Sequence, residues 1–312
     1  MARIRPHHGR NSAVLVALGS GIFEFVTTPI RATLAGVHLG DGQDVAVMGA
    51  INVSPGSFYP GSVVTAADEL LRTAERMVAE GAAILDVGAM STAPYLAGRV
   101  SGAEEAERLG WAVGLLAGKL GGVPISADTS RVEPARAALE AGAGIVNDVR
   151  GLMGDAGLAS LVARSGAGLI VMASESETLG SGSPVETVLR VLGASLRVAA
   201  QAGIASESIV VDPGIGFFRR RGLAWHDWDC AVLGGLSRLR DLGRPVCVGV
   251  SRKSFIGALA GEADPARRLA GSLASTAAAM LVGADVIRAH DVAETVQAVR
   301  VARAIRRARD GA

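Results

Sequence analysis

Eight short apolar runs alternate with helix-length segments along most of the chain, and this alternation constrains the fold more than any other feature. The runs span Val45–Val53, Ala82–Gly88, Pro124–Thr129, Gly144–Val149, Gly168–Ser174, Ser208–Gly214, Pro245–Ser251 and Ala284–Asp291. Most are continuously apolar, as is typical of parallel strands covered on both faces. Eight successive βα units predict an α/β protein with the architecture of a (β/α)8 TIM barrel.

The segments between the runs have the apolar spacing of amphipathic helices. In residues 67–80 the apolar stripe consists of Leu70, Leu71, Ala74, Met77 and Val78. Gly81 then offers a left-handed stop for that helix. An open doubly wound sheet is the rival architecture, but its Gly-x-Gly-x-x-Gly signature is missing after the first run.

Residues 1–44 lie outside the eight units and predict an N-terminal extension to a barrel domain of residues 45–312. The segments Ala13–Leu18 and Ala32–Leu39 are expected to form a hairpin that closes the bottom of the barrel. Arginines before residue 13 loosely imitate a signal peptide, but Gly19 and Glu24 interrupt the apolar stretch early, which favours a cytoplasmic protein.

Composition excludes several classes of function. Lys and Arg number 31 against 30 Asp and Glu, a net charge of +1, which argues against a nucleic-acid partner. The two cysteines, Cys230 and Cys247, form no Cys-x-x-Cys pair, so neither a disulfide framework nor a zinc ribbon is expected. The uncharged run Leu269–Ala284 is shorter than the roughly 20 residues of a spanning helix, so no membrane partner is expected.

Polar residues end most of the predicted strands, where a TIM barrel has its active site. They include Asn52, Asp86, Asp128, Asn147, Asp212, Ser251, Lys253, Arg288 and His290. A helix N-cap explains a single Asp or Asn. It does not explain Lys253, Arg288 and His290.

The polar set divides by chemistry into two groups. Asp128, Asn147 and Asp212 suit the donor-rich edge of a 2-amino-pyrimidinone ring. An anion or metal-bound diphosphate suits Asn52, Ser251, Arg288 and His290. Lys253 could reach either group. Since no His, Cys and carboxylate cluster has metal-site spacing, any metal is expected to be Mg²⁺ carried by a phosphate.

Seven motifs, in order, resemble the dihydropteroate synthase family from Val47 to Ile305. They are Met48-Gly-Ala-Ile-Asn-Val-Ser-Pro55, Ile84-Leu-Asp-Val-Gly88, Asp128-Thr129, Asn147-Asp148, Asp212-Pro-Gly-Ile-Gly-Phe217, Ser251-Arg-Lys-Ser-Phe-Ile-Gly257 and Arg288-Ala-His-Asp-Val292. The resemblance implies condensation of 6-hydroxymethyl-7,8-dihydropterin diphosphate with 4-aminobenzoate, with release of diphosphate. It also implies a homodimer.

Roles for individual residues follow from the same resemblance. The pterin is expected to bind Asp128, Asn147, Met172, Asp212, Phe217 and Lys253. Asp128, Asp212 and Lys253 are the expected catalytic residues. The diphosphate is expected at Asn52, Ser251, Arg288 and His290, with Asn52 also at the Mg²⁺. Buried carboxylates would stabilise the cationic methylene that forms when diphosphate leaves.

The chain departs from the family's usual pattern in the loops that cover the site. Ser54 and Gly56 replace a Thr and an Asp of the first loop, and Met90-Ser-Thr-Ala-Pro94 lacks the Glu and Arg of the second. Phe218-Arg219 stand where the family has Gly-Lys, and Ala173 stands for a His.

These loops receive the arylamine in the family, with Ser54, Thr92 and Ser254 on that side. The pattern is similar to an archaeal-type branch, whose acceptor is a ribosylated aminobenzene. Two alternatives stay open: a non-catalytic pterin-binding paralogue and a pterin-dependent methyltransferase with a corrinoid partner.

Overall fold

Eight parallel strands form the centre of the protein. The computed structural model describes residues 13–18, 22–53, 63–89, 100–175, 182–219 and 223–311, with only the backbone at 13–27, 63–65 and 310. The strands are β5 (Ala46–Asn52), β6 (Ile84–Gly88), β7 (Ile125–Asp128), β8 (Ile145–Asp148), β9 (Gly168–Met172), β10 (Ile209–Asp212), β11 (Cys247–Gly249) and β12 (Val286–Ala289).

The strand order is β10-β9-β8-β7-β6-β5-β12-β11, with every pair parallel. A bridge between Val211 and Val246 joins the two ends, and the Val211 N–H donates to the Pro245 carbonyl at 3.0 Å. The sheet therefore closes into the predicted TIM barrel. Each strand lies inside its predicted apolar run but is shorter than the run.

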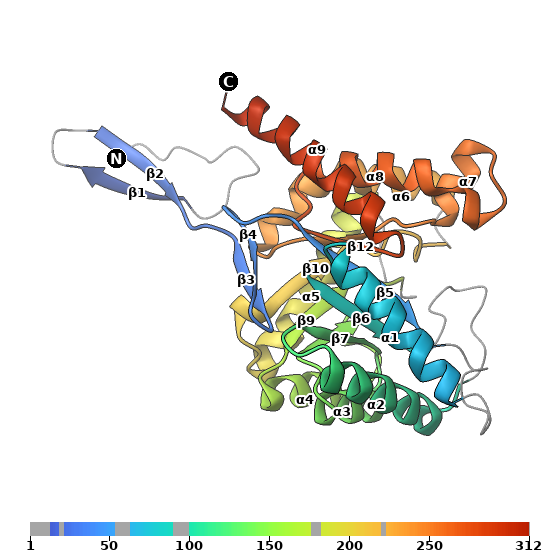
Figure 1. Cartoon of the computed structure of the whole chain (residues 1–312). Helices are drawn as coiled ribbons and strands as arrows, with labels where there is room; N and C mark the ends of the chain where they lie inside the picture. Colours follow the sequence, from blue (N-terminus) through green and yellow to red (C-terminus); the bar gives the residue numbers. More distant parts are fainter. Residues whose placement is uncertain are drawn as a thin grey trace.

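Helices surround the barrel in the expected alternation (Figure 1). They are α1 (Val63–Ala79), α2 (Gly102–Lys119), α3 (Val132–Glu140), α4 (Leu158–Ser165), α5 (Pro184–Ala202), α6 (Trp225–Gly234), α7 (Ser254–Ala260), α8 (Leu269–Leu281) and α9 (Val292–Asp310). On α1 the predicted stripe faces the barrel, where Leu70, Ala74 and Met77 are buried. Gly81 follows with a φ of 106°, a left-handed conformation that a glycine adopts without steric cost.

Helix α5 shows how local sequence sets a helix boundary. Ser183 accepts a hydrogen bond from the Glu186 N–H, and the Glu186 side chain accepts from the Ser183 N–H, which completes a capping box. Pro184 occupies the first turn, where its missing N–H costs nothing. The helix ends at Gly203, whose φ is 85°.

The N-terminal extension forms two hairpins instead of the single one that the sequence predicts. β1 (Ala13–Leu18) pairs with β2 (Ile22–Thr27), and β3 (Arg31–Leu34) pairs with β4 (Val37–Gly40). The predicted pairing of Ala13–Leu18 with Ala32–Leu39 is therefore wrong. Residues 31–40 fold back on themselves because Ala35 and Gly36 both have positive φ, as a tight two-residue turn requires.

The β3–β4 hairpin covers the end of the barrel at which the strands begin. Leu34 and Leu39 are fully buried. They pack in one cluster with Met48, Ile84, Ile145, Ile170, Val210, Cys247 and Val286 from the barrel interior. We call this end the base of the barrel.

Charged residues fasten the hairpin to the base. Arg240 donates to both carboxylate oxygens of Asp285, at 3.2 and 2.9 Å, and also to Asp41 after β4. Asp285 accepts the Val246 N–H at 2.9 Å, and Asp41 accepts the Ile30 N–H at 2.8 Å. Each carboxylate at the base thus has both an ionic and a backbone partner.

Candidate active site

The polar residues of the site form the next interior layer above the apolar base. Side chains two residues apart on a strand point to the same face. Ile84, Ile145, Val210 and Val286 are in the apolar cluster, and two residues further along the same strands are Asp86, Asn147, Asp212 and Arg288. The barrel interior therefore changes from apolar to polar in one step, at the end where the strands finish.

Arg288 lies at the centre of this layer and joins three strands. Its Nε donates to Asp86 Oδ2 at 2.6 Å, and its Nη2 donates to Asp128 Oδ2 at 2.9 Å. Asn147 Nδ2 donates to the same Asp86 oxygen at 3.1 Å. Burial alone would lower the pKa of Arg288, but the carboxylates of Asp86 and Asp128 reverse the effect and raise it.

The two carboxylates around Arg288 keep unused acceptor atoms. Asp86 Oδ1 and Asp128 Oδ1 are buried without a hydrogen-bond partner among the described residues. Burial raises the pKa of Asp128 to about 7, although the Arg288 charge partly offsets it. A buried carboxylate without a partner is costly, so these oxygens are positioned to accept from a ligand.

Asp212 and Lys253 bound the other side of the layer. The Asp212 carboxylate is buried and accepts the Gly214 N–H at 2.7 Å, and burial raises its pKa. Lys253 Nζ donates to the Ile215 carbonyl at 2.6 Å and lies 4.4 Å from the centre of the Phe217 ring. Burial lowers the pKa of Lys253 to about 8, although the negative charge of Asp212 partly offsets this effect.

Met172 lies beside Asp212, because the two residues pair across β9 and β10. Its side chain is 4% exposed. The structure thus brings Asp128, Asn147, Asp212 and Met172 together at the end of four consecutive strands.

A second group of residues lies at the rim. His290 Nδ1 is 3.1 Å from Ser251 Oγ, which also accepts the His290 N–H at 3.3 Å. Partial desolvation, together with the Arg288 charge, lowers the pKa of His290 to about 4. Asn52 lies at the end of β5. A Cβ atom placed on Gly88 would lie 3.5 Å from Asn52 Oδ1 and 3.5 Å from Asp128 Oδ2. A glycine at 88 therefore leaves open space between Asn52 and Asp128.

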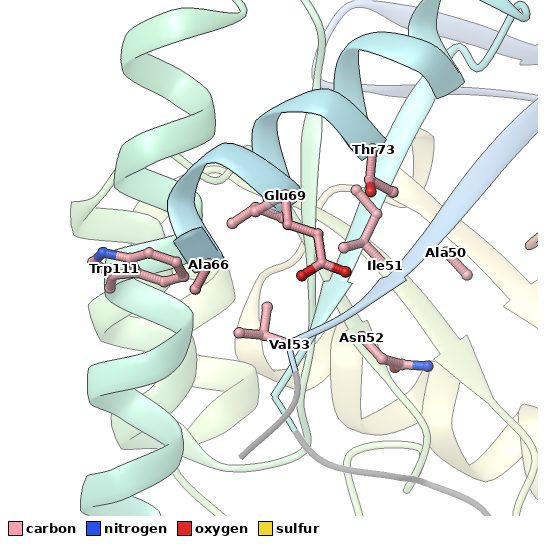
Figure 2. Close-up of a pocket in the computed structure, with 9 residues that line it drawn as sticks. Ala50, Ile51, Asn52, Val53, Ala66, Glu69, Thr73 and Trp111 are labelled. Carbon is pink, nitrogen blue, oxygen red and sulfur yellow. The ribbon is translucent and has the colours of Figure 1, made fainter. Parts of the chain in front are cut away.

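A separate cavity of about 210 Å³ lies on the outer side of β5 (Figure 2). Ala66, Glu69 and Thr73 of α1 and Trp111 of α2 line it, and Glu69 points toward Ile51 and Val53. It shares only Asn52 with the polar residues described above. The barrel interior, and not this cavity, is the candidate active site.

Comparisons with known proteins agree with this location. The sequence profile of the pterin binding enzyme family matches residues 48–290. The chain belongs to the pterin binding enzyme family. A dihydropteroate synthase of Synechocystis is 36% identical over 270 residues, covering 85% of this chain and 91% of the relative. One of Bacillus subtilis is 34% identical over 259 residues, covering 83% and 88%.

Solved structures of dihydropteroate synthases superpose over most of the chain. The Burkholderia cenocepacia protein, complexed with 7,8-dihydropteroate, gives a TM-score of 0.78 at 36% identity, covering 91% of this chain and 99% of that one. The Xanthomonas albilineans protein with 4-aminobenzoic acid gives 0.77 at 36% identity, covering 89% and 98%. Both likenesses support the pterin-binding barrel.

Within this family member, the structure places most of the candidate residues but not all. Ser54, Gly56, Thr92 and Ala93 lie outside the described residues. Ser254 is described, and its Oγ accepts from Arg219 Nη2 at 2.8 Å. The guanidinium of Arg219 also lies 4.2 Å from the centre of the Trp225 ring. Arg219 thus connects the loop after β10 to the start of α7.

Asp86 is the residue that sequence reasoning left without a role. It is fully buried and holds both Arg288 and Asn147. The available signal was an acidic residue inside the apolar run Ala82–Gly88, since a charge in a buried strand needs a partner. Arg288 was expected beside the diphosphate, but its hydrogen bonds go to Asp86 and to Asp128, a residue that was expected at the pterin.

Two further expectations concern metals and cysteines. Among the described residues, no group of three His, Cys, Asp or Glu could hold a metal ion. Cys247 is fully buried, and Cys230 is exposed and free.

No described helix is both long and apolar enough to span a bilayer.

Proposed function

We propose that this protein is a dihydropteroate synthase that joins 6-hydroxymethyl-7,8-dihydropterin diphosphate to 4-aminobenzoate or a related arylamine. In this reaction the bond from the exocyclic methylene to the diphosphate oxygen breaks, and a bond to the amine nitrogen forms. The amine loses one proton to solvent, and diphosphate leaves. The observation that carries the proposal is the ring of buried polar groups with unused acceptor oxygens at Asp86 and Asp128.

The pterin is assigned to the deep polar layer. Its 2-amino group and ring N–H need acceptors, which Asp128, Asp212 and the amide oxygen of Asn147 supply. Lys253 offers the matching donor for the ring carbonyl. Buried carboxylates cost free energy until they meet donors, so the pocket favours this ring over one without amino groups.

Departure of diphosphate leaves a cationic methylene conjugated to the pterin. The carboxylates of Asp128 and Asp212 lie in a desolvated pocket and stabilise positive charge there more strongly than water would. Arg288 from the deep layer, together with His290 and Ser251 at the rim, stabilises the departing anion. Since the arylamine attacks a cation, no strong base is needed.

Mg²⁺ is proposed to enter with the diphosphate. The described residues offer it few ligands, and one of them is Asn52 Oδ1, which lies beside Gly88 as Asp128 Oδ2 does. This donor set suits a hydrated Mg²⁺ that is held mainly by phosphate oxygens. When bound, the ion would neutralise charge on the leaving diphosphate.

The cellular setting completes the proposal. Two unpaired cysteines fit a reducing cytoplasm. A homodimer is proposed on the resemblance alone, and sedimentation velocity tests it directly.

The decisive assay measures diphosphate release from the dihydropterin diphosphate with Mg²⁺, with and without 4-aminobenzoate. We expect release that depends on the arylamine and is lost with a chelator. Asp212→Asn should lower pterin affinity about 100-fold, because a buried donor–acceptor match is broken. Asp68→Asn is the matched control, since Asp68 lies exposed on α1.

Two outcomes contradict the proposal. Tight pterin binding with no diphosphate release, either with 4-aminobenzoate or with related arylamines, would identify a non-catalytic pterin-binding paralogue. A change in corrinoid absorbance on mixing would identify a methyltransferase.

A further inference from the structure

The loops that follow β11 and β12 are tied together by one ion pair. Arg252 Nε donates to Asp291 Oδ2 at 2.8 Å, and Arg252 Nη2 donates to Asp291 Oδ1 at 2.5 Å. The side chains are 30% and 18% exposed. Two parallel bonds between a guanidinium and a carboxylate fix orientation as well as distance.

The Asp291 side chain pairs with Arg252 and does not cap the helix that follows it. It is the N-cap residue of α9, a position where an aspartate ordinarily accepts an N–H of the first helical turn. Its side chain makes no such bond. The carboxylate is instead directed across to Arg252, so stabilising α9 does not explain its orientation.

Arg252 has a backbone conformation that a non-glycine residue rarely adopts. Its φ is 56°, in the left-handed region. The start of α8 holds this conformation at both ends of the residue. Ser272 Oγ accepts the Arg252 N–H at 2.8 Å, and Arg268 Nη1 donates to the Arg252 carbonyl at 3.2 Å.

The two neighbours of Arg252 both belong to the active site. Ser251 contacts His290 through its Oγ, at 3.1 Å from Nδ1. Lys253 reaches the Ile215 carbonyl on the opposite side. Asp291 is itself the neighbour of His290, so the ion pair joins the two residues that adjoin Ser251 and His290 in the chain.

We propose that Arg252 and Asp291 are positioning residues, whose ion pair sets the register of the two loops so that Ser251 and His290 face one anion together. This proposal rests on the proposed function only in taking that anion to be the leaving diphosphate. A neutral imidazole and a hydroxyl are weak anion ligands separately. Their contribution depends on convergence, and a displacement of about 1 Å can cost up to 100-fold in rate.

The first test measures binding of inorganic diphosphate with Mg²⁺ by calorimetry. Asp291→Asn keeps the size of the side chain and its ability to cap α9, but removes the charge. We expect diphosphate affinity to fall about 10-fold, while affinity for 6-hydroxymethyl-7,8-dihydropterin changes less than about twofold. Asp44→Asn is the matched control, because Asp44 also pairs with an arginine on α9, Arg303.

The second test asks whether the two residues act as a unit. Arg252→Gln and the double variant with Asp291→Asn should each lose the same diphosphate affinity as the single Asp291→Asn change. Arg252→Lys keeps the positive charge but cannot donate two parallel hydrogen bonds to Asp291, so this variant should retain part of the diphosphate affinity. In turnover assays, the variants should raise KM for the dihydropterin diphosphate more than they lower kcat.

Several results would overturn the proposal. These are unchanged diphosphate affinity in Asp291→Asn, equal loss of both ligands, additive losses in the double variant, or a wild-type protein that binds no diphosphate. Failure of the synthase assignment looks different. In that case the wild-type protein binds diphosphate and the variants weaken it as expected, yet no arylamine-dependent release occurs.

Discussion

The two ends of the barrel each carry an arginine between two aspartates, but the two clusters differ in how completely they are bonded. At the base, Arg240 joins Asp41 and Asp285, and each carboxylate also accepts a backbone N–H. At the mouth, Arg288 joins Asp86 and Asp128, and one oxygen of each carboxylate has no partner among the residues that the structure describes. The residue types are the same in both clusters. What separates a structural cluster from a ligand site is therefore whether every carboxylate oxygen has a hydrogen-bond partner.

The largest expected effect tests the base. Arg240→Met should lower the free energy of unfolding by about 3–5 kcal/mol, because it leaves the buried Asp285 without its charge partner. Turnover by the folded fraction should stay within about twofold, since Arg240 lies at the far end of the barrel. Urea unfolding and diphosphate release measure the two quantities. A large loss of turnover in the folded protein would contradict the separation of roles.

The next effect tests the mouth. Arg288→Lys keeps the charge but cannot reach two carboxylates in a fork, so turnover should fall about 100-fold. The free energy of unfolding should change by only about 1 kcal/mol. If stability fell as far as in Arg240→Met, the mouth would be a structural cluster like the base.

A smaller effect on stability concerns Asp128 at the mouth. Asp128→Asn removes a carboxyl group whose pKa is raised to about 7 in the folded protein. Above that pH the group is ionised, and its charge is unfavourable in the fold. The folded protein binds this proton more tightly than the unfolded chain, so stability falls as the pH rises from about 4 to 7. The variant should lose that decline and be at least as stable as wild type at pH 8, while turnover drops. Thermal unfolding at pH 5 and pH 8 measures the difference.

The smallest effect is the pH profile of kcat/KM. Activity should rise as Asp128 ionises near pH 7 and fall as Lys253 loses its proton near pH 8. Asp128→Asn should remove the acid limb of whatever activity remains. An acid limb that persists in this variant would assign it to another group.

Local patterns of the sequence predict much of the fold. Continuous apolar runs and 3.6-residue periodicity depend only on neighbouring residues, so the eight βα units could be read directly. Strand ends then follow, and with them the identity of Asp128, Asn147, Asp212 and Arg288 as site candidates. The N-terminal pairing failed because hairpin register depends on a tight turn at Ala35-Gly36, which competes with longer-range pairing.

The sequence by itself determined the barrel, the position of its polar layer and the family resemblance, since each depends on residue order and spacing. Only the tertiary structure decided which charges meet. Asp86 and Arg288 are 202 residues apart, and Arg240 and Asp41 are 199 apart. No local pattern specifies such pairs, because closing the barrel brings together side chains from strands far apart in the chain. Whether a buried carboxylate is fully bonded or has a free oxygen is therefore a property of the folded barrel alone.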